Sequence, residues 1–133
     1  MNGFFDGASR GNPGKAGAGA LMINSEGKVV WEKALFLGEK TNNEAEYMAL
    51  ITLLKAAKEQ GIRSLKVFGD SKLVISQVSR QWKINLPHLR LLAQEAWALS
   101  EGMDISYHWI PREENKRADI LSNEGIDGAQ RFC

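Results

Sequence analysis

The sequence predicts an α/β domain in which a five-stranded mixed sheet is flanked by helices. Two observations lead to this fold class. Short apolar, strand-type segments fill the first third of the chain, and beyond residue 43 segments with helical spacing alternate with further strands. A length of 133 residues suits one compact domain with a single core. We expect this domain to span residues 1–124, followed by a loosely held tail at 125–133.

Three strands are expected at the start of the chain, at residues 2–8, 16–23 and 29–37. Residues 10–14 (RGNPG) and 24–27 (NSEG) separate them, and both segments consist of residues that favour turns. Because both connections are short, the three strands are predicted to form an antiparallel meander.

The remaining elements alternate between helix and strand. Apolar residues at helical spacing predict a helix over Asn43–Gln60, which ends before Gly61 as helices often do. The later elements are expected as a strand at 65–69, helices at 71–79 and 87–100, a strand at 105–110 and a helix from about 115 to 123. Trp31, Trp97 and Trp109 are assigned to the core.

Composition excludes several classes of protein. Hydrophobic residues make up 44% and charged residues 25%, which is ordinary for a globular domain. No apolar run approaches the roughly 18 residues that a membrane span requires, and the N-terminus lacks a signal-peptide pattern. Cys133 is the only cysteine, so no disulfide can form within the chain. We therefore expect a cytoplasmic monomer without membrane contact.

One glutamate lies on the apolar side of its predicted helix. On a wheel of 3.6 residues per turn, Glu46 falls in the stripe formed by Ala49, Leu50 and Leu53. A carboxylate in that position is costly unless something pairs with it. One interpretation is a capping box, with Asn43 as the cap and Glu46 folded back onto its backbone. The other is a metal ligand, and the two do not exclude each other.

Three aspartates occupy comparable positions. Asp6 follows two phenylalanines in a predicted strand, where aspartate is disfavoured. Asp70 follows the strand at 65–69, at the sheet edge where ligands bind in open α/β folds, although it could equally cap the next helix. Asp119 lies between Ala118 and Ile120, where it could simply be solvated. Acids on four separate elements suggest a shared hard cation such as Mg²⁺ or Mn²⁺.

Four segments resemble type 1 ribonuclease H (RNase H), in that family's order. Residues 6–14 (DGASRGNPG) resemble its DGS-x-x-GNPG opening, and residues 41–46 (TNNEAE) resemble the TNN-x-x-E stretch that begins its first helix. Residues 69–71 (GDS) resemble its third acidic site, and residues 115–119 (NKRAD) its N-x-x-A/C-D close. The resemblance covers essentially the whole chain. It implies an RNase H-like sheet of five strands, the first three antiparallel.

The resemblance also implies an activity, namely endonucleolytic hydrolysis of the RNA strand of RNA–DNA hybrids to give 5′-phosphate and 3′-hydroxyl ends. Asp6, Glu46, Asp70 and Asp119 would bind two Mg²⁺ ions, for which Mn²⁺ could substitute. Asp6 would bridge both ions, Asp119 would complete one site, and Glu46 with Asp70 would complete the other. Two such ions flank the scissile phosphate in enzymes of this kind.

Family resemblance assigns the substrate contacts to nearby loops. Ser9, and Glu46 with it, would meet ribose 2′-hydroxyls, the group that distinguishes RNA from DNA. Asn12, Asn42 and Asn43 would contact the hybrid in its minor groove, and Thr41 would hold a DNA phosphate. Asn12 as a turn former and Asn43 as a helix cap are structural interpretations that hold alongside these.

Other features concern the region after the third acid. Trp82, between cations at positions 80 and 83, corresponds to a tryptophan that packs along the DNA strand in the family, although packing on the core is an alternative. Residues 81–86 connect two helices directly, without the basic insertion that many bacterial members use as a handle, so hybrid binding should be weaker and more salt-sensitive. Many family members have a histidine-rich loop before the last acid. In this chain Ile110–Asn115 takes the place of that loop and contains no histidine. Arg112 would act there electrostatically, because arginine cannot serve as a base.

Other functions remain open from the sequence alone. They are a non-catalytic nucleic-acid-binding domain, a DNA exonuclease or recombinase domain of the same fold, and the RNase H domain of a larger reverse-transcriptase-like protein. Retention of all four acids speaks against the first, and the TNN segment and the Ser9 loop speak against the second.

Overall fold

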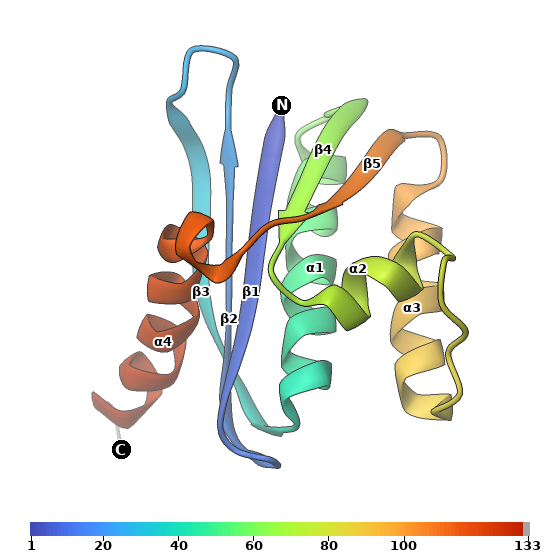
Figure 1. The fold of residues 1–133 in the computed structure, drawn as a ribbon. Helices are drawn as coiled ribbons and strands as arrows, with labels where there is room; N and C mark the ends of the chain where they lie inside the picture. Colours follow the sequence, from blue (N-terminus) through green and yellow to red (C-terminus); the bar gives the residue numbers. More distant parts are fainter. Residues whose placement is uncertain (132–133) are drawn as a thin grey trace.

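A computed structural model describes residues 1–131 and contains a five-stranded mixed sheet (Figure 1). Its elements are β1 (Asn2–Gly11), β2 (Gly14–Ile23), β3 (Val29–Lys40), α1 (Asn42–Glu59), β4 (Ser64–Gly69), α2 (Lys72–Val78), α3 (Pro87–Ser100), β5 (Asp104–Trp109), the 3₁₀ turn η1 (Arg112–Glu114) and α4 (Lys116–Arg131). The strand order is β3-β2-β1-β4-β5, with β1, β2 and β3 antiparallel and β4 and β5 parallel to β1. The predicted fold class and meander are confirmed.

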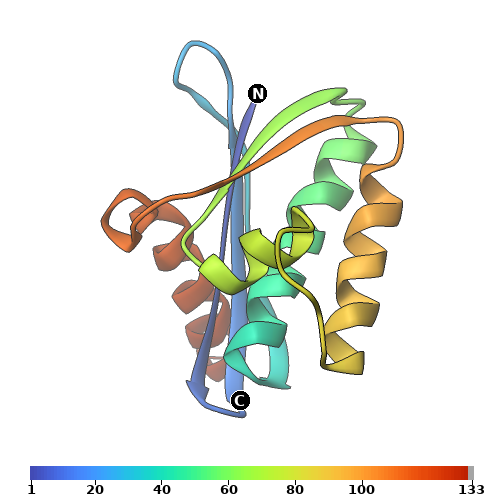
Figure 2. The same ribbon diagram turned by 45° about the vertical axis from the view of Figure 1, so that its right-hand side comes forward.

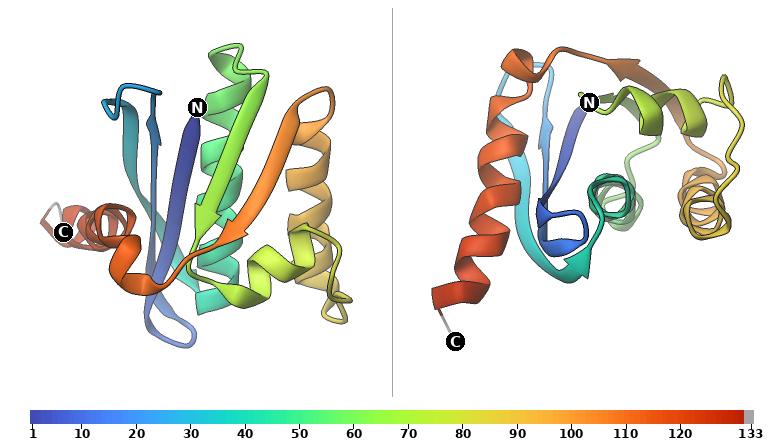
Figure 3. Two further views of the ribbon diagram at one scale, coloured as in Figure 1. Left: turned by 45° about the horizontal axis from the view of Figure 1, so that its top comes forward. Right: turned by 60° about the horizontal axis from the view of Figure 1, so that its bottom comes forward.

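Helices cover the two faces of the sheet unequally. Helix α4 packs alone on one face, over β2 and β3, whereas α1 and α3 lie on the other (Figures 2 and 3). The main core forms between the sheet and α1, and it includes Phe5, Met22, Leu50 and Val67. A smaller apolar cluster of Leu21, Ala118 and Leu121 lies under the start of α4. None of the described helices is long and apolar enough to cross a membrane.

The offset between β1 and β4 creates the edge at which the acids gather. Pairing between these parallel strands ends at Phe5 with Gly69, but β1 continues to Gly11. Beyond that point the β4 side of β1 carries unpaired backbone groups, which other residues must satisfy. Asp6 and Gly7 are the first residues of β1 in this open stretch, and Asp70 directly follows the end of β4.

Three local expectations were wrong. Strands β1 and β2 continue into the predicted 10–14 turn, so that only Asn12 and Pro13 connect them. Helix α4 continues to Arg131 instead of ending near Asn123, because Gly125 packs directly against the β3 backbone, where a Cβ would meet Leu35 atoms at 2.5–2.9 Å. The proposed boundary at residue 125 falls inside α4, and the end of the proposed tail, Phe132 and Cys133, lies outside the described residues.

The third correction concerns a predicted core residue. Trp109 is 48% exposed, whereas Trp31 and Trp97 pack against the core as expected. The Trp109 indole N–H donates to the backbone carbonyl of Asp70 at 3.1 Å, and the Lys72 ammonium lies 5.8 Å from its ring centroid. The end of β5 therefore lies beside one of the expected acids.

Candidate active site

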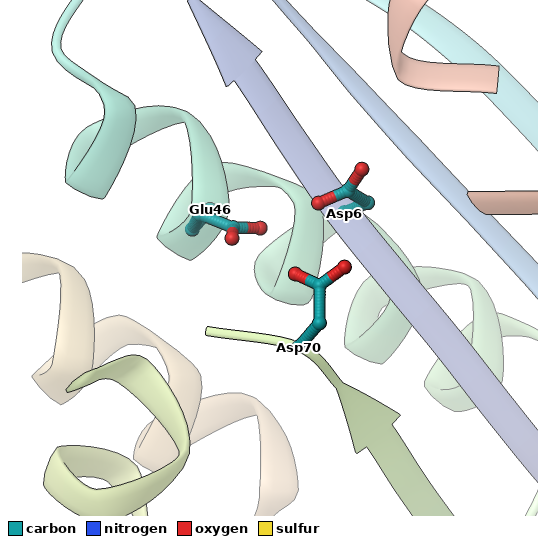
Figure 4. Close-up of side chains that lie close together, drawn as sticks. All are labelled: Asp6, Glu46 and Asp70. Atoms are coloured by element: carbon teal, nitrogen blue, oxygen red, sulfur yellow. The ribbon is translucent and has the colours of Figure 1, made fainter. Parts of the chain in front are cut away.

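Three of the four expected acids converge on one point. Asp6 of β1, Glu46 of α1 and Asp70 after β4 each offer a carboxylate oxygen, and these oxygens all lie within 4.8 Å of one another (Figure 4). Asp6 is 5% exposed and Glu46 9% exposed. Figure 4 shows the three side chains pointing toward one another from separate elements.

Helix α1 begins one residue earlier than expected, and its capping box does not use Glu46. Thr41 caps the helix, its hydroxyl accepting the Glu44 N–H at 3.2 Å, and the Glu44 carboxylate accepts the Thr41 N–H at 3.0 Å. The capping box is therefore Thr41 with Glu44, and the alternative of Asn43 with Glu46 is wrong. Glu46 instead accepts the Gly7 N–H at 2.6 Å, which is one of the open β1 amides.

Gly7 permits this approach of β1 to α1. A Cβ at Gly7 would lie 2.2–2.4 Å from backbone atoms of Ala45 and Glu46, a distance that no side chain tolerates. The glycine after Asp6 thus lets the helix backbone approach the strand closely enough for Glu46 to reach the Gly7 N–H and the other acids.

Asp70 does not cap a helix, and Asp119 faces the cavity that holds the other acids. Ser71, not Asp70, caps α2, its hydroxyl accepting the Val74 N–H at 3.2 Å. Asp119 is outside the tight group of three, but it lines the same cavity of about 510 Å³. Its carboxylate lies 3.7 Å from the Arg112 guanidinium, which places that arginine at the cavity rim.

The electrostatics of the cluster favour binding of a cation. Burial, followed by repulsion from Glu46 and Asp70, raises the pKa of Asp6 from 3.8 to about 10. Burial also raises the pKa of Glu46 to about 8, and it raises the pKa of Asp70. Among the side chains that the structure describes, no lysine or arginine forms an ion pair with any of these three acids. Arg112 offsets the rise in the pKa of Asp70 only in part, and a set of oxygen ligands in which none of the three acids is ion-paired to a described residue fits Mg²⁺ or Mn²⁺.

The expected substrate-binding residues form two groups. In the first, the Asn42 side-chain oxygen accepts the Ser9 N–H at 3.1 Å, and the Asn12 side-chain oxygen accepts the Asn42 N–H at 3.1 Å. Ser9, Asn42 and Asn43 line the cavity that holds the acids. These bonds attach the β1–β2 turn to the start of α1, next to the cap residue Thr41.

Trp82 belongs to a second cavity, of about 530 Å³, between α2 and α3. It is 47% exposed, so the alternative of a tryptophan packed on the core is wrong. Arg80, Lys83 and Arg90 line the same cavity, and the Arg80 guanidinium lies 3.9 Å from the Trp97 ring centroid. This surface is cationic and aromatic, whereas the first cavity is acidic.

Two residues beside Asp70 were not predicted from the sequence to belong to the acidic site. Asn115, although part of the NKRAD segment, received no role, yet its amide nitrogen lies 3.5 Å from the Asp70 carboxylate. Trp109 was assigned to the core from its apolar character alone. Trp109 ends β5, which lies next to β4 in the sheet, and Asp70 directly follows β4. This position at the end of a strand was the signal that could have placed Trp109 beside Asp70.

Known proteins resemble this chain over nearly its whole length. Residues 4–125 match a family described as reverse transcriptase-like. The chain is 43% identical over 130 residues to a ribonuclease HI of Halobacterium salinarum and 44% identical over 126 residues to a bifunctional protein of Mycobacterium tuberculosis, covering 65% and 35% of their lengths. It is 34% identical to a ribonuclease H of Cupriavidus necator, with 96% of both chains covered.

Solved structures agree with these sequence matches. RNase H1 from Halobacterium salinarum superposes with a TM-score of 0.92 at 43% identity, covering 96% of this chain and 97% of that one. LC11-RNase H1, solved in complex with an RNA/DNA hybrid, also has a TM-score of 0.92, at 34% identity and with 97% and 98% covered. Sequence, fold and the grouping of the acids agree, and the chain belongs to the type 1 ribonuclease H family.

Proposed function

We propose that this chain cleaves the RNA strand of RNA–DNA hybrids endonucleolytically, using two divalent metal ions bound by Asp6, Glu46, Asp70 and Asp119. The observation that carries the proposal is the convergence of two buried carboxylates and one half-buried carboxylate within 4.8 Å of one another, in a cavity that Asp119 also lines. Family membership and the hybrid bound to LC11-RNase H1 support the choice of substrate. One chain would be sufficient, since all four acids come from the same molecule.

The reaction is a hydrolysis. A water oxygen bonds to the scissile phosphorus, the bond from phosphorus to the 3′ oxygen breaks, and that oxygen takes up a proton. The products are a 5′-phosphate and a 3′-hydroxyl. When bound, the Mg²⁺ ions would supply Lewis acidity and lower the pKa of water. The carboxylates fix where these ions bind, and the folded chain orders them before substrate arrives.

Selectivity for RNA is assigned to the loop cluster beside the acids. We propose that Ser9 and Glu46 face ribose 2′-hydroxyls and that Asn12, Asn42 and Asn43 contact the minor groove. Because Ser9 at the end of β1 and Asn12 in the β1–β2 turn are already joined to the start of α1 by hydrogen bonds, these contacts need little rearrangement on binding. Contacts to sugars and phosphates carry little base information, so weak sequence preference is expected.

Three further assignments concern residues that would meet the phosphates or the DNA strand. Arg112, beside Asp119 at the cavity rim, would stabilise negative charge on the substrate without transferring a proton. Trp82 would stack along the DNA strand, with phosphate attraction from Arg80 and Lys83. Thr41 would hold a DNA phosphate, although the Glu44 carboxylate bonded to its N–H opposes an anion there.

The test is cleavage of labelled substrates by the whole chain. RNA–DNA hybrid, duplex RNA and duplex DNA are incubated with Mg²⁺ or with EDTA, and the product ends are mapped. We expect cleavage only of the RNA strand of the hybrid, only with Mg²⁺, and none by Asp6→Asn. Equal cleavage of duplex DNA, or cleavage of hybrid by Asp6→Asn at the wild-type rate, would refute the proposal.

A further inference from the structure

Asn115 lies where the elements carrying the acids meet. It is 2% exposed and occupies the position between η1 and α4. Its amide nitrogen donates to the Phe5 carbonyl at 2.9 Å, directly before Asp6, and to the Asp70 carboxylate at 3.5 Å. Its backbone carbonyl accepts the Asp119 N–H at 3.1 Å. One residue therefore contacts the segments that carry three of the four acids.

A purely structural role does not account for this side chain. An asparagine that only began α4 would direct its side-chain oxygen at the free N–H groups of that helix. The Asn115 amide points instead to β1 and to the end of β4. Its oxygen Oδ1 is buried and has no hydrogen-bond partner among the residues that the structure describes. An unpaired buried acceptor destabilises a fold, so stability alone does not explain this amide.

We propose that Asn115 is a positioning residue that orients the Asp70 carboxylate for binding of the divalent cation. The proposal rests on the proposed function only in that the acids bind a metal. A carboxylate with one oxygen held by an N–H loses its freedom to rotate, which leaves the other oxygen directed at the cluster. Hydrogen bonds of this kind to metal ligands typically change metal affinity or activity 10- to 100-fold when they are removed.

The contact to Phe5 gives Asn115 a second function at the same place. By bonding the carbonyl next to Asp6, the amide fixes the spacing between the β1 strand and the residue that follows β4. This spacing sets the separation of the Asp6 and Asp70 carboxylates. The anchor is independent of Trp109, which holds the backbone carbonyl of Asp70 and not its carboxylate.

The experiment measures Mn²⁺ binding to the whole chain by titration calorimetry, without nucleic acid. Asn115→Ala removes the side chain, and Asn115→Leu replaces it with an apolar group of similar volume. We expect both variants to bind Mn²⁺ about 10- to 100-fold more weakly than wild type. In cleavage assays the Mg²⁺ concentration for half-maximal rate should rise by a similar factor, while KM for hybrid at saturating Mg²⁺ should stay within about twofold.

Tyr47→Phe is the matched control, because it removes another buried side-chain hydrogen bond, from Tyr47 to Gln77 at 2.7 Å, inside the core. It should lower the melting temperature without changing Mn²⁺ affinity. If Asn115→Ala and Asn115→Leu bind Mn²⁺ as wild type does, the proposal is overturned even if wild type cleaves hybrid. If they lose affinity while wild type fails to cleave hybrid, the proposal stands and the proposed function fails.

Discussion

Replacing Asp6 by asparagine should stabilise the metal-free protein at neutral pH. The substitution keeps the shape of the side chain and removes one of three ionisable carboxyl groups whose oxygens lie within 4.8 Å of one another. At that separation, with an effective dielectric constant of about 20, each pair of charges costs roughly 3.5 kcal/mol. The folded protein avoids part of this cost by keeping a proton, which at pH 7 costs roughly 4 kcal/mol for a group with an ordinary aspartate pKa. We therefore expect a gain of about 1–4 kcal/mol.

The dependence of this gain on pH follows from the raised pKa. The unfolded chain ionises Asp6 near 3.8, whereas the folded chain keeps the proton until about pH 10. Between these values the folded state binds more protons, so wild-type stability falls as pH rises. The advantage of Asp6→Asn should be small at pH 4 and should grow toward pH 7.

Urea unfolding in EDTA at pH 4, 5.5 and 7 measures the effect, with Asp104→Asn on the exposed side of β5 as the control. Added Mg²⁺ should stabilise wild type more than the Asp6→Asn variant. The ion supplies positive charge to the clustered carboxylates, and wild type has one more of them to bind it. A loss of stability at pH 7, or a gain of equal size at every pH, would show that the three acids do not repel one another as argued.

Other outcomes follow from single contacts. Gly7→Ala should lower the free energy of unfolding by at least about 2 kcal/mol in urea and reduce cleavage, because its Cβ would collide with α1, whereas Gly128→Ala, with open space around its Cβ, should not. Glu44→Gln should tighten hybrid binding about two- to fivefold at low salt in fluorescence anisotropy, since glutamine keeps the cap with Thr41 but removes a negative charge; equal affinity at all salt concentrations would contradict this. Trp82→Ala should raise KM for hybrid at least fivefold with kcat unchanged in steady-state cleavage assays, because stacking on one base contributes about 1–3 kcal/mol; an unchanged KM would exclude stacking at this position.

The sequence was sufficient for the order of elements and for the acids, and the reason is the same for both. Alternation of apolar residues marks strands and helical spacing marks helices, and a carboxylate within either pattern stands out because its burial needs compensation. Glu46 was identified in this way from α1 alone. The residue that caps α1 was not identified, since Thr41, Asn42 and Asn43 are all competent caps and only the backbone geometry decides among them.

The remaining errors arose where tertiary packing overrides local signals. Gly125 and Gly128 weaken a helix locally, yet α4 continues through both because Gly125 gives the close approach to β3. Trp109 has an apolar side chain typical of a core residue, but it lies on β5 at the sheet edge and is half exposed. The contacts of Asn115 join residues 110 and 45 positions away, and no local pattern encodes such separations.

The acids that meet at the end of β4 are drawn from almost the full span of the polypeptide, from position 6 to position 119. In a growing chain, the set of four acids is therefore incomplete until α4 has been synthesised and has packed on the sheet. Assembly of the proposed metal site thus depends on the docking of α4, the helix that carries Asp119.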